Sequence, residues 1–90
     1  MTKADLVADI AQKTGIEKMA ILAVVEEFMA VVKSSLTQGE NVYLRGFGTF
    51  EVIERKEKTG RNITKGESIV VPAHNIPKFK PAQEFKDALR

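Results

Sequence analysis

Five cations stand close together between residues 55 and 65 of this 90-residue chain, in the sequence RKEKTGRNITK. Glu57 is the one acid among them, so the segment carries a formal charge of +4. Guanidinium and ammonium groups at this density repel one another unless an anion lies nearby, and both bind phosphate oxygens well. The segment therefore predicts a phosphate-binding site, with a solvated basic loop as the alternative. The cations are Arg55, Lys56, Lys58, Arg61 and Lys65.

Residues on either side predict that this segment lies at the end of a long β-hairpin. The preceding GFGTFEVIE alternates apolar and polar side chains, as a half-buried strand does. We expect strands over residues 41–44, 49–56 and 68–73, with a tight turn at 46–48. Pro72 cannot donate to a ladder, so its strand must have a free side there.

The tip of the hairpin is expected to comprise residues 61–64, because Gly60 and Gly66 allow the backbone to bend on both sides of it. Arg61 offers a planar donor fork to a phosphate or a base edge. Asn62 can both donate and accept hydrogen bonds in a groove.

Helical periodicity predicts helices over residues 3–14 and 17–38, and a short C-terminal helix with Pro81 at its first position. Thr2 and Asp5 form a capping pattern, and Gly15 is typical of a helix end. The second helix is apolar on more than one side and so needs more than one neighbour. A second copy of the chain meets that need most simply, and cover by the sheet of a monomer is the alternative.

Composition excludes several classes of site and partner. The chain has no Cys and one His, so it holds neither a disulfide nor a thiolate or His-based metal site. No catalytic constellation or phosphate-cradling glycine loop is visible, and we expect a non-enzyme without cofactor or small-molecule substrate. Residues 1–40 hold four cations against six acids, and residues 41–90 hold ten against six. The second half is therefore the predicted contact surface for a polyanion.

The N-terminus leads into an amphipathic pattern rather than a signal peptide. The apolar stretch over residues 19–32 is shorter than the roughly 20 residues that span a bilayer, and two acids interrupt it. We expect a soluble, cytoplasmic protein that does not contact membranes.

A family resemblance is carried by the segments LRGFGTFEVIERKEKTGRN and IPKFKPAQEFKDAL and by the two helices that open the chain. With these features the chain resembles the HU/IHF family of bacterial DNA-bending proteins. The resemblance covers essentially all 90 residues. It implies an α+β fold with a helical base, a three-stranded antiparallel sheet extended into a β-ribbon arm, and a short C-terminal helix. It also implies one domain over 1–90, with a helical dimerisation part at 1–40, the sheet and arm at 41–80, and the last helix at 81–90.

The resemblance further implies an intertwined dimer whose two arms wrap the minor groove of duplex DNA. Such a protein bends DNA with little sequence preference and compacts the nucleoid. The partners are then double-stranded DNA and a second copy, or a related subunit in a heterodimer. A site-specific DNA bender of the same fold remains an alternative, and so does a module that binds RNA or acidic proteins.

Ile63 stands where the family usually has a proline that wedges between base pairs. Isoleucine is also used as a wedge in the minor groove, but it lacks the preset backbone angle of proline. We expect bending to survive with less sharply fixed kinks, unless Ile63 is merely tolerated at an exposed tip. The implied arm contacts are Arg55, Lys56, Lys58, Arg61, Asn62, Ile63, Thr64 and Lys65.

Basic residues outside the arm fall where the family fold places contacts of the body with DNA, although a lone surface Lys is often simply solvated. They are Lys3, Arg45, Lys78, Lys80 and Lys86. Gln83 stands where many relatives have a cation, which weakens a contact there. Four phenylalanines are assigned to the dimer core rather than to base stacking: Phe28, Phe47, Phe50 and Phe79.

Overall fold

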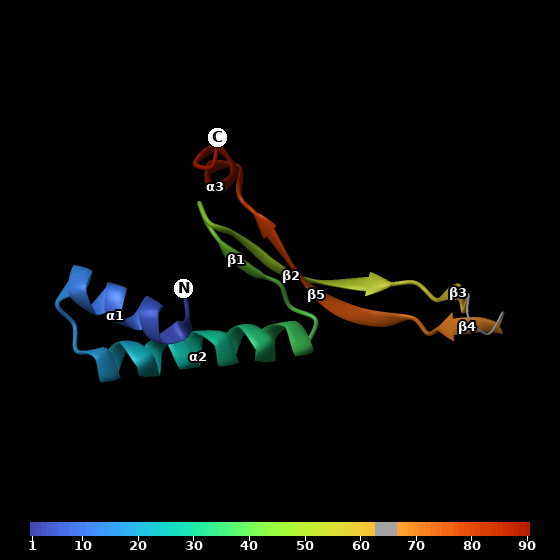
Figure 1. Ribbon diagram of the computed structural model, residues 1–90, viewed down its shortest axis with the longest axis horizontal. Coiled ribbons are helices and arrows are strands. Elements are labelled where there is room, and N and C mark those ends of the chain that lie inside the picture. The colour runs from blue at the N-terminus through green and yellow to red at the C-terminus, as the bar shows by residue number, and fades with distance from the viewer. Residues whose placement is uncertain (63–66) are drawn as a thin grey trace. The chain divides into compact units, whose positions relative to one another are not determined.

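The structure is a computed structural model that describes residues 1–62 and 67–90. The chain divides into two compact units, Met1–Ser34 and Ser35–Arg90. Two helices are followed by strands and a short C-terminal helix, which confirms the α+β class (Figure 1).

The first unit is a helix pair, and both helices were predicted to within one residue. Helix α1 spans Lys3–Thr14 and helix α2 spans Lys18–Thr37. The Thr2 side chain accepts a hydrogen bond from the backbone N–H of Asp5, whose carboxylate accepts one from the Thr2 N–H. Gly15 ends α1 in the left-handed conformation, at φ 74°. The predicted capping residues at both ends of α1 are confirmed.

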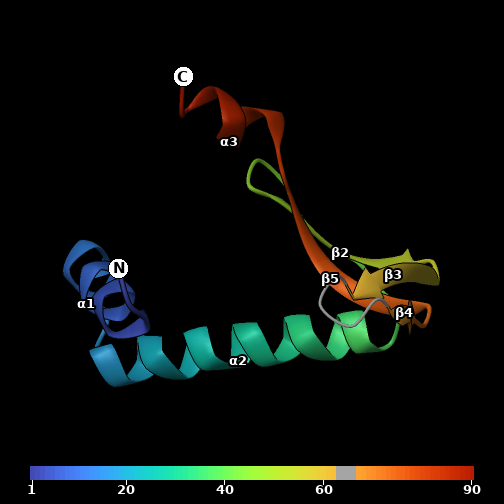
Figure 2. The ribbon, with the colours of Figure 1, turned by 45° about the vertical axis from the view of Figure 1, so that its right-hand side comes forward.

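Helices α1 and α2 lie side by side (Figures 1 and 2). Few of their apolar side chains are buried. Val7 and Ile21 are the buried apolar residues of the described first unit. The Lys3 ammonium pairs with the Glu26 carboxylate across the two helices. The chain leaves many large apolar side chains of these helices exposed, as predicted for α2: Leu6, Met19, Leu22, Val24, Phe28, Met29 and Val31.

Helix α2 ends in a Schellman motif that leads into the sheet. The N–H of Glu40 donates to the Ser35 carbonyl at 2.9 Å, and the N–H of Gly39 donates to the Leu36 carbonyl at 3.0 Å. Gly39 has φ 81°, a conformation that suits glycine in this motif. The chain then turns directly into the first strand.

The second unit contains a three-stranded antiparallel sheet in the order β1-β2-β5. Strand β1 spans Val42–Leu44, β2 spans Gly48–Arg55 and β5 spans His74–Pro81. The first two match the predicted strands to within one residue. The sheet was expected to continue to residue 80, but the predicted return strand ended at residue 73 and missed the bounds of β5. Pro77 and Pro81 interrupt the pattern of β5, and an edge strand tolerates both.

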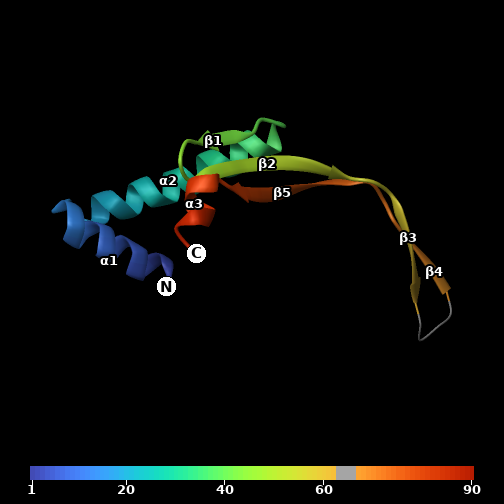
Figure 3. The same ribbon diagram turned by 90° about the horizontal axis from the view of Figure 1, so that it is seen from above.

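The hairpin of β2 and β5 continues as the predicted two-stranded ribbon, made of β3 (Lys58–Asn62) and β4 (Glu67–Val71). Arg55 pairs with His74, and Lys58 pairs with Val71. Each side of the hairpin therefore has two residues between the ladders, and the register is the same in both ladders. Figure 3 shows the ribbon curving between the two ladders. The ribbon is therefore one extended arm with an interruption near its base.

Two expectations for the arm were wrong. Pro72 lies outside both ladders, between Val71 and His74, rather than within an edge strand, because the missing N–H is accommodated where pairing stops. The predicted tip at 61–64 is also wrong in its first half. Strand pairing extends through Asn62 and Glu67, so the backbones of Arg61 and Asn62 belong to β3. Ile63, Thr64, Lys65 and Gly66 lie outside the described residues.

The C-terminal helix α3 spans Gln83–Asp87, two residues later than predicted. Pro81 pairs with Gly48 as the last residue of β5, and the N–H of Ala82 donates to the Phe47 carbonyl at 2.9 Å. The fixed φ of proline suits a strand end as well as a first helical turn. Pairing with β2 therefore continues to Pro81 and delays the helix.

Candidate nucleic-acid interface

The two faces of the sheet differ sharply in chemistry. Residues paired across antiparallel strands share a face, and alternate rows face opposite sides. The row Tyr43, Thr49 and Lys80 is polar, and so is the next pair on that face, Glu51 with Lys78.

The intervening row is apolar and consists of Val42, Phe50 and Phe79. The Phe79 ring centroid lies 4.9 Å from that of Phe50 and 5.2 Å from that of Phe47, and Phe47 lies 5.3 Å from Phe85 of α3. One face of the sheet thus holds an aromatic cluster, and the other is free to carry charge.

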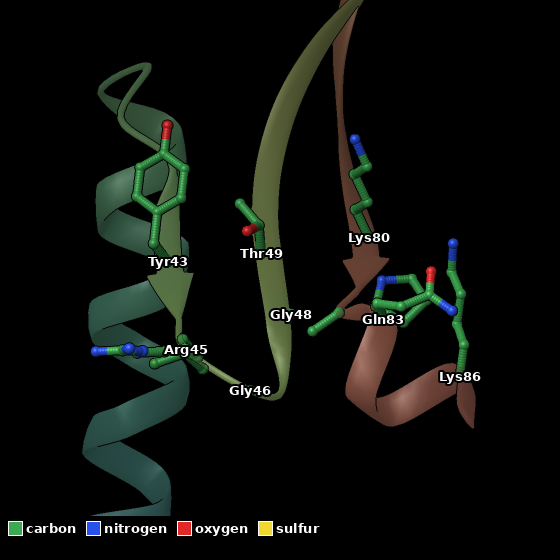
Figure 4. Close-up of a pocket in the computed structure, with 11 residues that line it drawn as sticks. Tyr43, Arg45, Gly46, Gly48, Thr49, Lys80, Gln83 and Lys86 are labelled. Carbon is green, nitrogen blue, oxygen red and sulfur yellow. The ribbon is translucent and has the colours of Figure 1, made fainter. Parts of the chain in front are cut away.

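A groove of about 550 Å³ opens between the turn that joins β1 to β2, strand β5 and helix α3 (Figure 4). Its polar lining includes Arg45, Lys80 and Lys86, which the sequence predicted as contacts of the body. Figure 4 shows the side chains of Lys80 and Lys86 extending to the same side as the Tyr43 ring, while Arg45 extends away from them. Lys78 lies on the polar face of the same sheet but does not line the groove.

The turn that carries Arg45 is fixed by its hydrogen bond and its glycine. The N–H of Phe47 donates to the Leu44 carbonyl at 3.0 Å, and Gly46 has φ 82°. A positive φ at the third residue of a four-residue turn is the type II pattern, which favours glycine. Arg45 therefore stands at the corner of a defined turn, with an exposed side chain.

Lys3 belongs to the first unit and is engaged within it. Its ammonium pairs with Glu26, and each side chain keeps about half of its exposure, 49% and 51%. A phosphate that bound Lys3 would compete with this carboxylate.

At the base of the arm, Arg55, Lys56 and Lys58 line a second pocket of about 560 Å³. Glu57 and His74 also line it. Three of the predicted arm cations thus gather around one concave site. The predicted contacts of Arg61 and Asn62 involve side chains outside the described part, as do all contacts of Ile63, Thr64 and Lys65.

Phe28 and Phe47 keep 44% and 45% of their exposure in the single chain, whereas Phe50 and Phe79 are half-buried in the aromatic cluster. Their assignment to a dimer core stays a prediction. The packing of Phe50 against Phe79 favours it over base stacking, because the two rings cover each other on the face opposite the cations.

Sequence reasoning missed four polar residues that line the two pockets: Tyr43, Thr49, His74 and Gln83, the last of which it had counted only as a lost cation. Arg45 lies in the turn after β1, which ends at Leu44, so its two-residue spacing from Tyr43 was no signal of a shared strand face. The positions of Thr49 and His74 depend on cross-strand register, which the sequence does not display.

The described residues show neither a cluster of metal ligands nor a membrane-spanning helix. No group of three or more His, Cys, Asp or Glu side chains there is placed to hold a metal ion. Among the helices described, none combines the length and apolar character that a membrane span requires.

Comparison with known proteins agrees with this geometry. A family model described as bacterial DNA-binding protein matches residues 1–90. DNA-binding protein HU of Thermus thermophilus is 44% identical over 90 residues, which cover 100% of this chain and 93% of the relative. An integration host factor subunit alpha of Anaeromyxobacter is 38% identical over 89 residues, or 99% of this chain and 90% of the relative.

Solved structures show the same likeness. HU of Anabaena in a cocrystal with DNA superposes with a TM-score of 0.92 at 32% identity, covering 99% of this chain and 97% of that one. HU of Thermotoga maritima, at 24% identity and a TM-score of 0.71, shares the fold over the full length of both chains. With a match along all 90 residues and relatives above 40% identity, the chain belongs to the bacterial DNA-binding protein family of HU and integration host factor.

Proposed function

We propose that the protein is an architectural DNA-binding protein that binds duplex DNA as a dimer, with little sequence preference, and bends it. One observation carries the proposal. The sheet separates an aromatic face from a polar face with Lys78 and Lys80, and its two longer strands continue into the cationic arm. The likeness to HU in complex with DNA supports duplex DNA as the polyanion.

Binding on this account is chiefly electrostatic. Arg45, Lys80 and Lys86 contact phosphates from the groove beside the sheet, while Arg55, Lys56 and Lys58 contact them from the arm. Each phosphate neutralised releases condensed cations, so log affinity falls with log salt at a slope of about −0.9 per contact. Contacts of this kind carry no base information, which accounts for low sequence preference.

Bending requires an additional element at the arm tip. Ile63 is the apolar residue positioned by sequence to enter the minor groove and unstack a base step. Unstacking costs a few kcal/mol per step, and phosphate contacts along the arm and body offset that cost. Arg61, Asn62, Thr64 and Lys65 flank the wedge and contact the groove walls.

A dimer follows from the apolar surface that one chain leaves uncovered. The described helices bury Val7 and Ile21 well, while Phe28 and Val24 keep 44% and 68% of their exposure. At roughly 25 cal/mol per Å² of apolar area, covering such side chains stabilises a complex by several kcal/mol. A second copy covers them and brings a second arm to the same DNA.

The remaining properties follow from this role. The protein acts without catalysis, cofactor or small-molecule substrate. It resides with the nucleoid in the cytoplasm and contributes to DNA compaction.

A site-specific bender is the second candidate, because integration host factor subunits are also relatives of this chain. Arg45 and deformable base steps would then supply selectivity. Competition between random duplexes and duplexes enriched by selection separates the two. We expect similar affinities, whereas a ratio of about 10³ or more would favour the site-specific bender.

The proposal as a whole is tested by gel shift with purified protein, using duplex DNA, RNA of the same sequence and an acidic protein at one fixed salt concentration. Tight binding to duplex DNA, strengthened by nicks or preformed bends, is the expected result. Binding to the RNA or the acidic protein alone would contradict it.

A further inference from the structure

The pocket at the base of the arm has a feature that the phosphate contacts above do not use. It lies where the ladder of β2 and β5 gives way to that of β3 and β4, and it is lined by residues from both. Val71 and Ile76 form its apolar part. We call it the arm-base pocket.

His74 occupies this pocket in a defined orientation. It pairs with Arg55 at the last position of the sheet, and its Nδ1 atom lies 2.9 Å from the Pro72 carbonyl oxygen. A carbonyl oxygen only accepts, so Nδ1 is the donor in this contact and carries a hydrogen. In the neutral ring the other nitrogen, Nε2, is then an acceptor.

A phosphate oxygen also only accepts, so neutral His74 has no hydrogen to offer it from Nε2. Protonation of Nε2 from solvent turns that atom into a donor and adds a positive charge. The charged groups of the pocket in the described residues are Arg55 from β2, Lys56 and Glu57 from the connection, and Lys58 from β3. Among the side chains that the structure describes, strands β4 and β5 add Val71, Ile76 and His74 itself to the lining.

We propose that the arm-base pocket binds a phosphate group of the DNA backbone and that His74 takes up a proton from solvent when it does so. The bound phosphate opposes the charge of Arg55, Lys56 and Lys58 and accepts from the imidazolium. The Pro72 carbonyl, which lies between the two ladders, orients the His74 ring through the Nδ1 hydrogen bond. The proton taken up by Nε2 therefore lies where the arm leaves the sheet. This inference rests on the proposed function.

Linkage makes the proposal measurable. If binding takes up one proton, the affinity for DNA increases as pH falls, by up to about tenfold per pH unit. Histidine side chains generally titrate between about pH 5 and 8. His74 is the single histidine of the chain, so its ring signals are unambiguous.

The first experiment follows the His74 ring protons by NMR across this pH range, in the free protein, with a saturating short duplex, and with sulfate, which does not titrate there. The titration midpoint is expected to move to higher pH with the duplex. A similar move with sulfate would show that the pocket recognises a free oxyanion as well. An unchanged midpoint with the duplex, or a move with sulfate alone, overturns the proposal.

The second experiment compares His74→Gln, which is never charged, with His74→Lys, which always is. Duplex affinity of the natural chain is expected to rise on acidification, while that of both variants stays constant. At neutral pH, His74→Lys should also steepen the salt dependence by about 0.9 relative to His74→Gln. If binding by His74→Gln still depends on pH, the proposal is overturned. If the natural chain fails to bind DNA at any pH, the proposed function is contradicted instead.

Discussion

Phe79 occupies the space that a side chain at Gly48 would need. A β carbon built on Gly48 would lie 2.6 Å from the Phe79 Cζ atom and 2.6 Å from the Lys80 carbonyl oxygen. Glycine at this position lets the Phe79 ring lie across β2, where it joins Phe47 and Phe50. The aromatic face of the sheet therefore depends on the absence of one methyl group.

Gly48→Ala should lower the free energy of unfolding by about 1–3 kcal/mol, the usual cost of overpacking. The upper part of that range is expected, because the Lys80 carbonyl belongs to the backbone and gives way less easily than a side chain. Thr49→Ala, on the polar face, is the control and should cost much less. Urea denaturation of both variants measures the difference, and equal midpoints would refute this packing role.

Lys80→Gln and Lys86→Gln should each flatten the dependence of log affinity on log salt by about 0.9, because each removes one phosphate contact from the groove. Lys13→Gln removes the same charge at the end of α1, where Lys13 pairs with Asp9, and serves as the control. Fluorescence titrations with a labelled duplex at several salt concentrations give the slopes. A residue whose removal leaves the slope unchanged does not contact a phosphate.

Tyr43 provides an intrinsic reporter for the same surface. It is the single tyrosine of a chain without tryptophan, it is 74% exposed, and it lines the groove with Lys80. Duplex binding should change its emission, because DNA on the polar face of the sheet alters the surroundings of the ring. Tyr43→Phe should abolish the signal without abolishing binding. Saturating DNA with no change in emission would place the duplex away from this face.

Phe28→Asp should favour the monomer, since a carboxylate is costly to bury at an apolar interface. Sedimentation equilibrium is expected to give a dimer for the natural chain and a lower average mass for the variant. A matched Glu27→Gln change beside it should leave the dimer intact. A natural chain that is monomeric at all concentrations, with a melting temperature independent of concentration, would contradict the dimer.

The pKa of Asp5 lies below its ordinary value because its carboxylate accepts hydrogen bonds from Thr2. The Thr2 backbone N–H has the larger effect and the Thr2 side chain the smaller. A lowered pKa in the folded chain means that the cap stabilises α1 at neutral pH and loses that effect as pH falls through the folded pKa. Asp5→Asn should therefore lower the melting temperature at pH 7, and the difference should shrink below about pH 4. A difference that does not vary with pH would show that the charge of Asp5 is irrelevant.

The sequence predicted those parts of the fold that local chemistry determines. Thr2, Asp5 and Gly15 mark the ends of α1 through hydrogen bonds within a few residues, and the alternation before Arg55 marks β2. The bounds of β5 and the start of α3 were missed because pairing with β2, rather than local preference, decides the conformation of Pro77 and Pro81. His74 was assigned no role because only the register brings it opposite Arg55.

In the arm, too, strand pairing overrides a conformation that the local sequence suggests. The cations of the arm were evident from composition, but strand pairing through Asn62 and Glu67 places Arg61 and Asn62 in β3 rather than in the tip that Gly60 and Gly66 suggested. Glycine permits a bend without requiring one, so strand pairing overrode it. Ile63 remains the residue on which the bending prediction depends.

Ile63→Ala should reduce the bend angle more than the affinity, because the wedge unstacks DNA while the cations supply most of the binding free energy. Ile63→Pro, with its fixed backbone angle, should bend DNA at least as sharply as the natural chain. Ring-closure rates of short duplexes report the bend. Identical closure by the natural chain and Ile63→Ala would rule out the wedge.

The central claim is that this chain bends duplex DNA, and energy transfer between dyes at the two ends of a short duplex tests it most directly. Saturating protein should bring the ends closer together, to the same extent on duplexes of unrelated sequence. An end-to-end distance that stays at the value of free DNA, while gel shift shows the duplex fully bound, would contradict it.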